Sequence, residues 1–427
     1  MRACRTCVLV LVLAGCGRTN LDLPFGQPDS APAPALPADA AIDKVGHPTD
    51  VRACRWAGFA PQVTYEGAGH FLAVADFNGD GHIDVVATAW GGIYNGTASV
   101  YLNQGNGTFV PPTTYNTDME AEGVAAADFS GDGKPDFAVG NDVHDLDVFL
   151  NQGDGTFGPF VQHRVPGYSG VMVASDFNRD GHPDLAATQS SSIAIFLGDG
   201  QGSFSPPTTY ASGGNVDSIT VSDLNGDGYP DIVVSNADFT GLCPEALCLP
   251  TGLGAGTANV FINQGDGTFA PQASYAAGNG TGSVAVGDFN SDGAPDIAAV
   301  NGVDNTLSVF FNQGDGTFAP QVTYSNTIDG FVPVTPFLDP GGEVVAADFD
   351  GDGRDDVVVV QCSSQGRNGM LIFRAGNGDG TFRVPVTYPI VDYPGVPVVA
   401  DFNGDGFPDV AVTISYDKMG VFLSDCE

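Results

Sequence analysis

The chain has 427 residues, of which 42% are hydrophobic and only 15% are charged. This composition excludes an intrinsically disordered chain, and the 59 glycines and 29 prolines indicate many turns. The formal net charge of −37 argues against a nucleic-acid partner, because the chain offers no basic surface to phosphates.

The N-terminal residues have the pattern of an export signal. Arg2 and Arg5 precede a short apolar run, residues 8–13, which is too short to span a membrane as a helix. The run leads into Leu-Ala-Gly-Cys16, which resembles a bacterial lipobox. The resemblance implies cleavage before Cys16, which would become the lipid-bearing N-terminus. An ordinary signal peptide with incidental cysteines is the alternative.

The segment after the signal reads as a tether. We assign residues 1–15 to the signal peptide and residues 16–53, rich in Pro, Ala and Asp, to a solvated linker. Gly17 stands where an aspartate would favour the inner membrane, so we expect the outer membrane or surface of a bacterial cell envelope. The lipid anchor would be the only contact with the membrane.

From residue 54 to residue 427 the chain repeats a nine-residue acidic loop. One copy reads Asp288-Phe-Asn-Ser-Asp-Gly-Ala-Pro-Asp296, with oxygen-bearing side chains at positions 1, 3, 5 and 9 and glycine at position 6. Such oxygens suit a hard cation such as Ca²⁺, and glycine permits the turn. Seven copies follow one another at spacings of 47–65 residues, a period typical of a propeller.

Each repeat reads as four short strands. In the fifth repeat we expect strands at residues 284–288, 297–300, 307–312 and 318–324. The acidic loop separates the first two strands, and a glycine-rich hairpin turn separates the last two. Seven such units predict an all-β fold, a seven-bladed β-propeller of four-stranded antiparallel blades.

The two ends of the chain complete each other. Residues 59–65 are identical to residues 318–324 but precede any acidic loop, whereas the last repeat stops after its third strand, at residues 421–423. We therefore expect the N-terminal segment to supply the outer strand of the seventh blade, which leaves the ring without an open edge.

Cysteines flank this closure. Cys54 precedes the N-terminal strand and Cys426 follows its partner, and we predict a disulfide between them that contributes about 4–5 kcal/mol at most. Cys243 and Cys248 are predicted to pair within one loop, and Cys362 to remain a buried thiol. Export makes disulfides reasonable.

The loop and its setting resemble the FG-GAP/VCBS repeats, the family that includes the integrin α-subunit β-propeller. The resemblance covers roughly residues 57–426, and it rests on Asp-Phe-Asn-Gly-Asp-Gly-x-x-Asp and on the recurring Asn-Gln-Gly-Asp-Gly-Thr-Phe turn. It implies up to seven Ca²⁺ ions, one per blade. The implied ligands are Asp76, Asn78, Asp80 and Asp84; Asp128, Ser130, Asp132 and Asp136; Asp176, Asn178, Asp180 and Asp184; Asp223, Asn225, Asp227 and Asp231; Asp288, Asn290, Asp292 and Asp296; Asp348, Asp350, Asp352 and Asp356; and Asp401, Asn403, Asp405 and Asp409.

The acidic loops do not have the pattern of an EF-hand. An EF-hand needs a bidentate glutamate at position 12, where all seven copies have alanine or valine. Seven acidic turns without metal remain the structural alternative, although the crowded aspartates would repel one another. Ser130 is a weaker ligand than Asn or Asp, and Arg179 would add a positive charge near the third ion.

A four-stranded meander separates two faces. The acidic loops and the hairpin turns share one face, and the longer connections share the other, which suggests a recognition surface there. Its exposed aromatic candidates are Trp90, Tyr94, Phe239 and Phe331. Packing within their own loops is the alternative for each.

Nothing in the sequence selects a reaction. No Cys/His spacing predicts a zinc site, and the acids at Asp118, Glu120, Glu122, Asp142 and Asp145 do not have a spacing that favours a glycosidase or lyase over a solvated rim. We expect a monomer without enzymatic activity. The resemblance implies that it acts at the cell surface as a binding or adhesion module for an extracellular protein or glycan. A polysaccharide-degrading propeller enzyme and a structural envelope protein are the alternatives.

Overall fold

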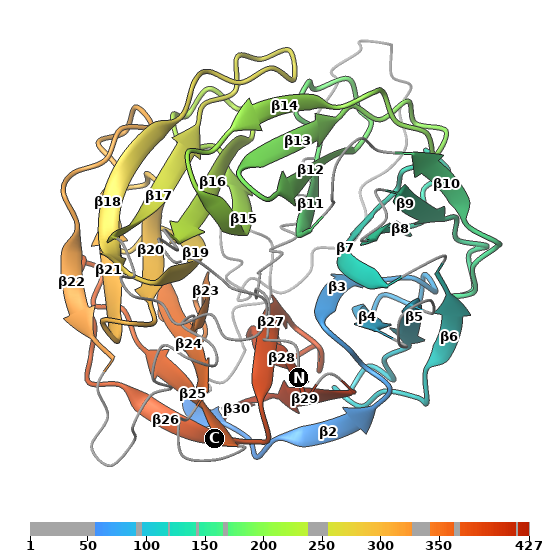
Figure 1. Cartoon of the computed structure of the whole chain (residues 1–427). Helices are drawn as coiled ribbons and strands as arrows, with labels where there is room; N and C mark the ends of the chain where they lie inside the picture. The colour runs from blue at the N-terminus through green and yellow to red at the C-terminus, as the bar shows by residue number, and fades with distance from the viewer. Residues whose placement is uncertain are drawn as a thin grey trace, which may run out of the picture.

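The structure, a computed structural model, forms a ring of seven β-sheets, each with four antiparallel strands (Figure 1). It describes residues 56–90, 96–117, 120–141, 145–164, 170–237, 255–326, 342–362, 368–415 and 417–426. All secondary-structure elements in these ranges are strands, and none of the described residues forms a helix that could cross a membrane. The predicted seven-bladed propeller is confirmed.

The strands of the first four blades run in chain order from the centre outward. Blade one contains β3 (Phe71–Ala75), β4 (Asp84–Trp90), β5 (Gly96–Tyr101) and β6 (Thr113–Asn116). Blade two contains β7 (Ala121–Ala127), β8 (Asp136–Asn141), β9 (Asp145–Phe149) and β10 (Val161–Arg164). Blade three contains β11 (Met172–Ser175), β12 (Asp184–Gln189), β13 (Ser192–Phe196) and β14 (Thr208–Ala211). Blade four contains β15 (Asn215–Ser222), β16 (Asp231–Ala237), β17 (Ala255–Phe261) and β18 (Ala273–Asn279).

The remaining blades follow the same order, except that the last one combines three strands from the C-terminal part of the chain with one strand from the N-terminal part. Blade five contains β19 (Thr281–Gly287), β20 (Asp296–Asn301), β21 (Thr306–Phe310) and β22 (Val322–Ser325). Blade six contains β23 (Glu343–Ala347), β24 (Asp356–Cys362), β25 (Asn368–Arg374) and β26 (Val386–Val391). Blade seven contains β27 (Pro394–Ala400), β28 (Asp409–Ile414), β29 (Lys418–Phe422) and β2 (Val63–Glu66).

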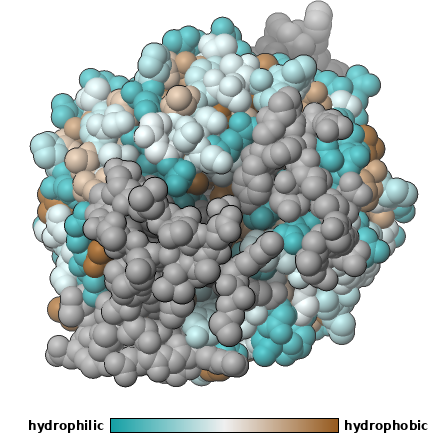
Figure 2. Space-filling view, in the orientation of Figure 1, coloured by the Kyte–Doolittle hydropathy of each residue, from teal (hydrophilic) through white to brown (hydrophobic). Residues whose placement is uncertain are grey.

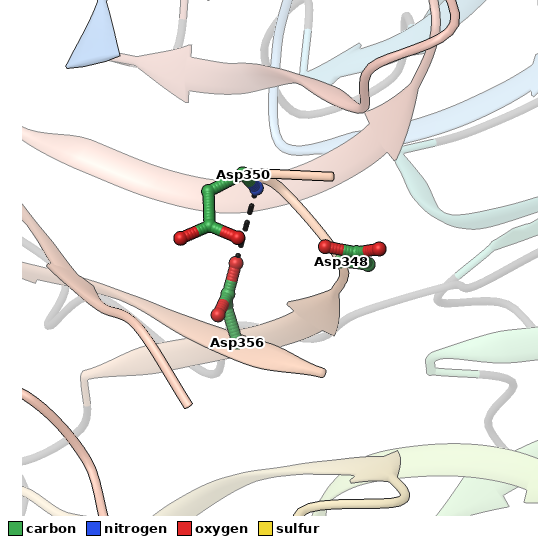
Figure 3. Close-up of side chains that lie close together, drawn as sticks. All are labelled: Asp348, Asp350 and Asp356. Carbon is green, nitrogen blue, oxygen red and sulfur yellow. Dashed lines mark hydrogen bonds between the residues drawn. The ribbon is translucent and has the colours of Figure 1, made fainter. Parts of the chain in front are cut away.

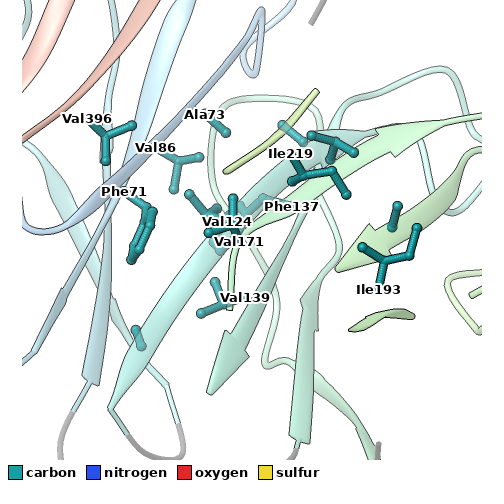
Figure 4. Close-up of a cluster of buried hydrophobic side chains, with 14 of the residues drawn as sticks. Phe71, Ala73, Val86, Val124, Phe137, Val139, Val171, Ile193, Ile219 and Val396 are labelled. Atoms are coloured by element: carbon teal, nitrogen blue, oxygen red, sulfur yellow. The ribbon is translucent and has the colours of Figure 1, made fainter. Parts of the chain in front are cut away.

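The core lies between the faces of neighbouring blades. The second strands are buried along their length, as in β8, β20 and β28. The outer strands are mostly exposed, and in β6 and β22 only the tyrosine at the third position is half-buried. One cluster of buried side chains joins residues of several blades, among them Phe71, Val139, Ile193 and Ile219 (Figure 4). On the outside, the described surface is mostly hydrophilic on the side shown in Figure 2.

The N-terminal segment closes the ring, as predicted, but it is divided into two strands. β2 pairs with β29 as the outer strand of blade seven. β1 (Trp56–Phe59) instead pairs with β30 (Ser424–Cys426), and Phe59 lies opposite Ser424. In the six other blades, the turn before the outer strand forms a single bridge between the same two positions, for example Asn312 to Phe318. The β1–β30 ribbon is therefore the seventh copy of that turn, divided between the two ends of the chain.

The outer strands are shorter than predicted. In blade five we expected a strand over residues 318–324, but β22 begins at Val322. Pro320, which lies between the Phe318 bridge and the strand, has no N–H to donate to a ladder. Pro61, at the equivalent position of the N-terminal segment, separates β1 from β2.

The predicted cysteine pairs lie largely outside the described residues. Cys426 pairs across the ribbon with Trp56, two residues along the chain from Cys54, which is itself outside these ranges. Cys16, Cys243 and Cys248 also lie outside them. Cys362 is buried, and its Sγ donates to the carbonyl oxygen of Pro394 at 3.4 Å, in agreement with the predicted buried thiol.

Blade six carries a charge where the other blades have an aromatic ring. Arg374 is 5% exposed and donates to the Oδ1 of Asn326 and to the carbonyl oxygen of Ser325. The equivalent third-strand residues of the other blades are buried aromatics: Tyr101, Phe149, Phe196, Phe261, Phe310 and Phe422. The described partners of this buried guanidinium are therefore neutral.

We expect Arg374→Phe to leave the free energy of unfolding unchanged or to raise it by up to about 2 kcal/mol, because a buried charge is costly to desolvate and replacing buried ionic groups by well-packed apolar side chains is often neutral or stabilising. Chemical denaturation measures the change. The reverse substitution in blade five, Phe310→Arg, is the control and should destabilise the protein strongly. A loss of more than about 1 kcal/mol in Arg374→Phe would contradict the expectation.

Candidate metal centres

Each acidic loop connects the first and second strands of one blade. We number them from loop one (76–84) through loops two (128–136), three (176–184), four (223–231), five (288–296) and six (348–356) to loop seven (401–409). The hairpin turns lie on the same face, since the backbone N–H of Asn103 in the first turn donates to the carboxylate of Asp84 in loop one. The predicted arrangement of loops and turns on one face is confirmed.

The aspartate at position 1 organises the backbone of its loop. In loop one, Asp76 Oδ1 accepts the N–H groups of Gly79 and Asp80 at 2.8 and 3.1 Å, and Oδ2 accepts that of Gly81 at 2.8 Å. The other six loops repeat the bonds to positions 5 and 6. Gly81 has a φ of 88°, the left-handed conformation that favours glycine.

The aspartate at position 9 ties the loop to the hairpin turn of its blade. Asp84 is fully buried; its Oδ2 accepts the N–H of Phe77 at 2.9 Å and its Oδ1 accepts that of Asn103 at 2.7 Å. Five of the other six copies form the corresponding pair of bonds. In loop two the bond from the turn is kept, but the N–H of Ser130, at position 3, donates to Oδ2 of Asp136 in place of the position 2 N–H. The sequence predicted these residues as metal ligands but did not predict this backbone role.

Burial raises the pKa of the position 9 carboxyls, although their hydrogen bonds to the backbone act in the opposite direction. The pKa rises to about 6 for Asp84, Asp184 and Asp231, and to about 7 for Asp296, Asp356 and Asp409. A cation beside such a group favours its charged form. The electrostatics of the loops therefore suit a bound positive charge.

Positions 3 and 5 are linked to each other in most loops. In loop one, Nδ2 of Asn78 donates to Oδ2 of Asp80 at 2.9 Å, and the N–H of His82 donates to Oδ1 of Asp80 at 2.9 Å. Ser130 of loop two lies 3.5 Å from Asp128 Oδ1. These side chains lie at the exposed end of the loop, whereas position 9 lies at its buried end.

Loop six brings its carboxylates closest together (Figure 3). Oxygen atoms of Asp348, Asp350 and Asp356 lie within 4.8 Å of one another, the only such group among the described residues. The backbone N–H of Asp350 also donates to Oδ2 of Asp356 at 3.2 Å. Asp352, at position 5, is not part of this group.

The residues present fit a calcium ion. All four predicted positions offer oxygen, which hard cations require, and each carboxylate has about four lone-pair sites, of which the backbone takes only some. Positions 1, 3, 5 and 9 would hold the ion, and the ion would supply charge that offsets the repulsion among the carboxylates. Its role at these loops would be structural.

Arg179 points away from its own loop. Its guanidinium lies 4.7 Å from the ring centroid of Tyr229 in loop four. The expected positive charge beside the third site is therefore directed to the neighbouring blade instead.

The turn asparagines were not predicted as functional, yet they join neighbouring blades. Nδ2 of Asn151, in blade two, donates to the carbonyl oxygen of Phe77 in loop one at 2.8 Å, and Asn263 and Asn312 bond in the same way to the blade before each of them. Asn103 bonds to Phe402 at 2.7 Å across the closure between blades one and seven. The repetition of Asn-Gln-Gly-Asp-Gly could have indicated this role.

The candidates for the opposite face are mostly outside the described residues. Tyr94, Phe239 and Phe331 lie there, as do Asp118 and Asp142. Trp90 is half-buried and stacks on His70, with ring centroids 3.9 Å apart. Trp90 therefore packs against a neighbour and presents only part of its surface.

Two family models match the chain. The model described as FG-GAP-like repeat matches residues 76–139, 128–175, 176–234, 245–299, 288–359 and 348–412. The model described as FG-GAP repeat matches residues 215–257. Together these matches include all the acidic loops.

Among curated proteins, the chain is similar to phosphatidylinositol-glycan-specific phospholipase D from Rattus norvegicus. The two are 37% identical over 101 residues, which is 20% of this chain and 12% of the rat protein. The chain therefore spans about an eighth of the length of that relative.

Solved structures share the fold at low identity. The BP39L lectin from Burkholderia pseudomallei has a TM-score of 0.56 and 16% identity, and the match covers 84% of this chain and 100% of the lectin. An Agrocybe aegerita lectin that recognises non-reducing terminal N-acetylglucosamine has a TM-score of 0.51 and 20% identity, with 83% and 88% coverage. BBS1N, in complex with ARL6DN, has a TM-score of 0.54 and 9% identity, with 87% and 97% coverage.

Proposed function

The chain belongs to the FG-GAP-like repeat family, and from this premise we propose that it is an extracellular, non-enzymatic module that binds a protein or glycan and is stabilised by Ca²⁺ in its acidic loops. The observation that carries the proposal is the closed seven-bladed ring with one acidic loop per blade. Two of its structural neighbours are lectins and a third is in complex with a partner protein. This support is an analogy of fold, so the partner must be identified by experiment.

We propose that the partner binds on the face of the ring opposite the acidic loops. Their buried hydrogen bonds give the loops a role in holding each blade together, whereas the connections on the opposite face vary in length. We place the partner on the opposite face, with Trp90, Tyr94, Phe239 and Phe331 as the candidate aromatic contacts.

We further propose that Cys16 anchors the chain in the cell envelope through a lipid. Mass spectrometry of the mature protein tests this: an acylated N-terminal Cys16 is the expected product. An unmodified N-terminus elsewhere in the sequence would contradict it.

Binding is tested with residues 54–427 as bait, in a glycan array and in a pull-down from cell-surface material, each with and without Ca²⁺. We expect retention of one class of glycan or one protein, without any product formed from it. New reducing or unsaturated ends after incubation with polysaccharides would instead support the enzyme alternative.

Removal of calcium should lower stability. Each occupied loop contributes about 2.7 kcal/mol when free Ca²⁺ is one hundred times its dissociation constant, because the ion binds the folded chain and not the unfolded one. We therefore expect chelation to lower the Tm by several degrees for each loop that was occupied and re-addition of Ca²⁺ to restore it. No bound ion in calorimetric titration and no change in Tm would contradict calcium binding.

A further inference from the structure

The loops fall into two groups according to what holds the aspartate at position 5. In five loops, asparagine at position 3 donates its Nδ2 to Oδ2 of that aspartate at 2.9 Å: Asn78 to Asp80, Asn178 to Asp180, Asn225 to Asp227, Asn290 to Asp292 and Asn403 to Asp405. Loops two and six have no asparagine there, since position 3 is Ser130 and Asp350.

A positively charged side chain replaces the amide in both exceptions. In loop two, Nζ of Lys134 lies 3.0 Å from Oδ2 of Asp132. In loop six, Nη1 of Arg354 and Nη2 of Arg383 lie 3.2 and 3.0 Å from Oδ2 of Asp352. Nη1 of Arg383 also lies 3.3 Å from Oδ2 of Asp350. A full charge therefore takes the position of a neutral donor only where the asparagine is absent.

We propose that Lys134 in loop two, and Arg354 with Arg383 in loop six, are resident cations that weaken Ca²⁺ binding at these two loops, so that the chain has five tight sites and two weak ones. This inference rests on the proposed calcium binding. The five loops with asparagine each present three carboxylates. At positions 1, 3, 5 and 9, loop two presents three carboxylates, held with one ammonium, and loop six presents four carboxylates, held with two guanidinium groups, so each has one negative charge fewer at these positions. The fifth carboxylate of loop six, Asp355, instead accepts the N–H of Asp288 in loop five at 2.7 Å.

The expected difference follows from repulsion between like charges. A divalent ion held by the aspartate at position 5 would be separated from the resident cation only by the carboxylate that both of them contact. At about 5–6 Å, even with the screening of bulk water, this repulsion lowers affinity by about tenfold or more. Calcium affinity in acidic loops also depends on the number of ligand charges.

The clustered carboxylates of loop six do not remove this effect. Asp348, Asp350 and Asp356 approach one another, but Asp352 is held by both arginines and Asp350 by one of them. An ion that bound both Asp350 and Asp352 through these oxygen atoms would have to displace Arg383.

Loop three provides an internal control, because it carries a positive charge that does not hold its position 5 aspartate. Arg179 lies over Tyr229, and Asp180 keeps its bond to Asn178 at 2.9 Å. A charge that is merely nearby should therefore not change the group to which a loop belongs.

The test is the number of tight Ca²⁺ sites on the purified full chain, measured by equilibrium dialysis and calorimetric titration at one fixed pH and ionic strength. We expect five for the wild type, six for Lys134→Gln, six for Arg354→Gln/Arg383→Gln, and five for the control Arg179→Gln. Circular dichroism checks that each variant is folded. These substitutions are at partly exposed side chains, so a folded protein is expected.

Other outcomes overturn the inference in distinguishable ways. Seven sites of equal affinity, or variants that leave the number of tight sites unchanged, would reject the resident cations while calcium binding stands. An increase caused by Arg179→Gln would show that nearby charge alone decides affinity. The absence of any tight site would reject calcium binding itself, and the inference with it.

Discussion

Replacing Phe59 by alanine is expected to lower the free energy of unfolding by about 3–5 kcal/mol, the usual cost of deleting a buried aromatic ring. Phe59 is 6% exposed, and four aromatic rings surround it at centroid distances of 5.4–6.0 Å: those of Trp56, Phe349, Phe373 and Tyr388. Three of these rings belong to blade six or to its loop, so Phe59 joins the chain terminus to a neighbouring blade. The measurement is chemical denaturation followed by fluorescence.

The matched control is Phe318→Ala, because Phe318 lies in an identical seven-residue sequence and is also 6% exposed. Phe318 belongs to a continuous turn, whereas Phe59 belongs to a turn divided between the two ends of the chain. We expect both variants to be destabilised, but only Phe59→Ala to become sensitive to proteases near the N-terminus under native conditions. Equal protease resistance of the two variants would contradict the closing role of β1.

The fold was predictable because its signal is repeated. Each acidic loop marks the boundary between two strands, and the identity of residues 59–65 and 318–324 indicates the closure of the ring. The division into β1 and β2 was not predicted, since it depends on a bridge between Phe59 and Ser424 that brings together opposite ends of the chain. Arg374 was missed for a related reason: its burial follows from packing against blade five.

The sequence predicted which residues make up the acidic loops, but it did not predict which of them are buried in the fold and which are exposed. Spacing places oxygen atoms at positions 1, 3, 5 and 9, and the structure shows that position 9 is buried while position 5 is exposed. The difference arises because β4 and its equivalents begin at position 9, within the sheet. Only the folded chain brings the backbone N–H of Asn103, in the hairpin turn, to the carboxylate of Asp84.

Asp231→Ala is therefore expected to destabilise the protein even without metal, by about 2–6 kcal/mol. The substitution leaves two buried backbone N–H groups without acceptors, those of Leu224 and Asn263, which now donate to Asp231 at 2.9 and 2.7 Å. Each such unsatisfied donor costs about 1–3 kcal/mol. Denaturation in the presence of a chelator measures this loss of stability separately from any effect of calcium binding.

Asp227→Asn is the matched control within the same loop, because Asp227 is exposed and accepts from Asn225 and Tyr229 at the surface. In chelator it should unfold like the wild type, whereas in Ca²⁺ it should lose the stabilisation of one site. If Asp231→Ala matched the wild type in chelator, position 9 would act only through a metal. If both variants lost the same amount in chelator, the loop would act as one hydrogen-bonded unit. The expected separation would show that the buried aspartate supports the fold without metal, in addition to its part in holding the ion, whereas the exposed aspartate contributes to stability only through the ion.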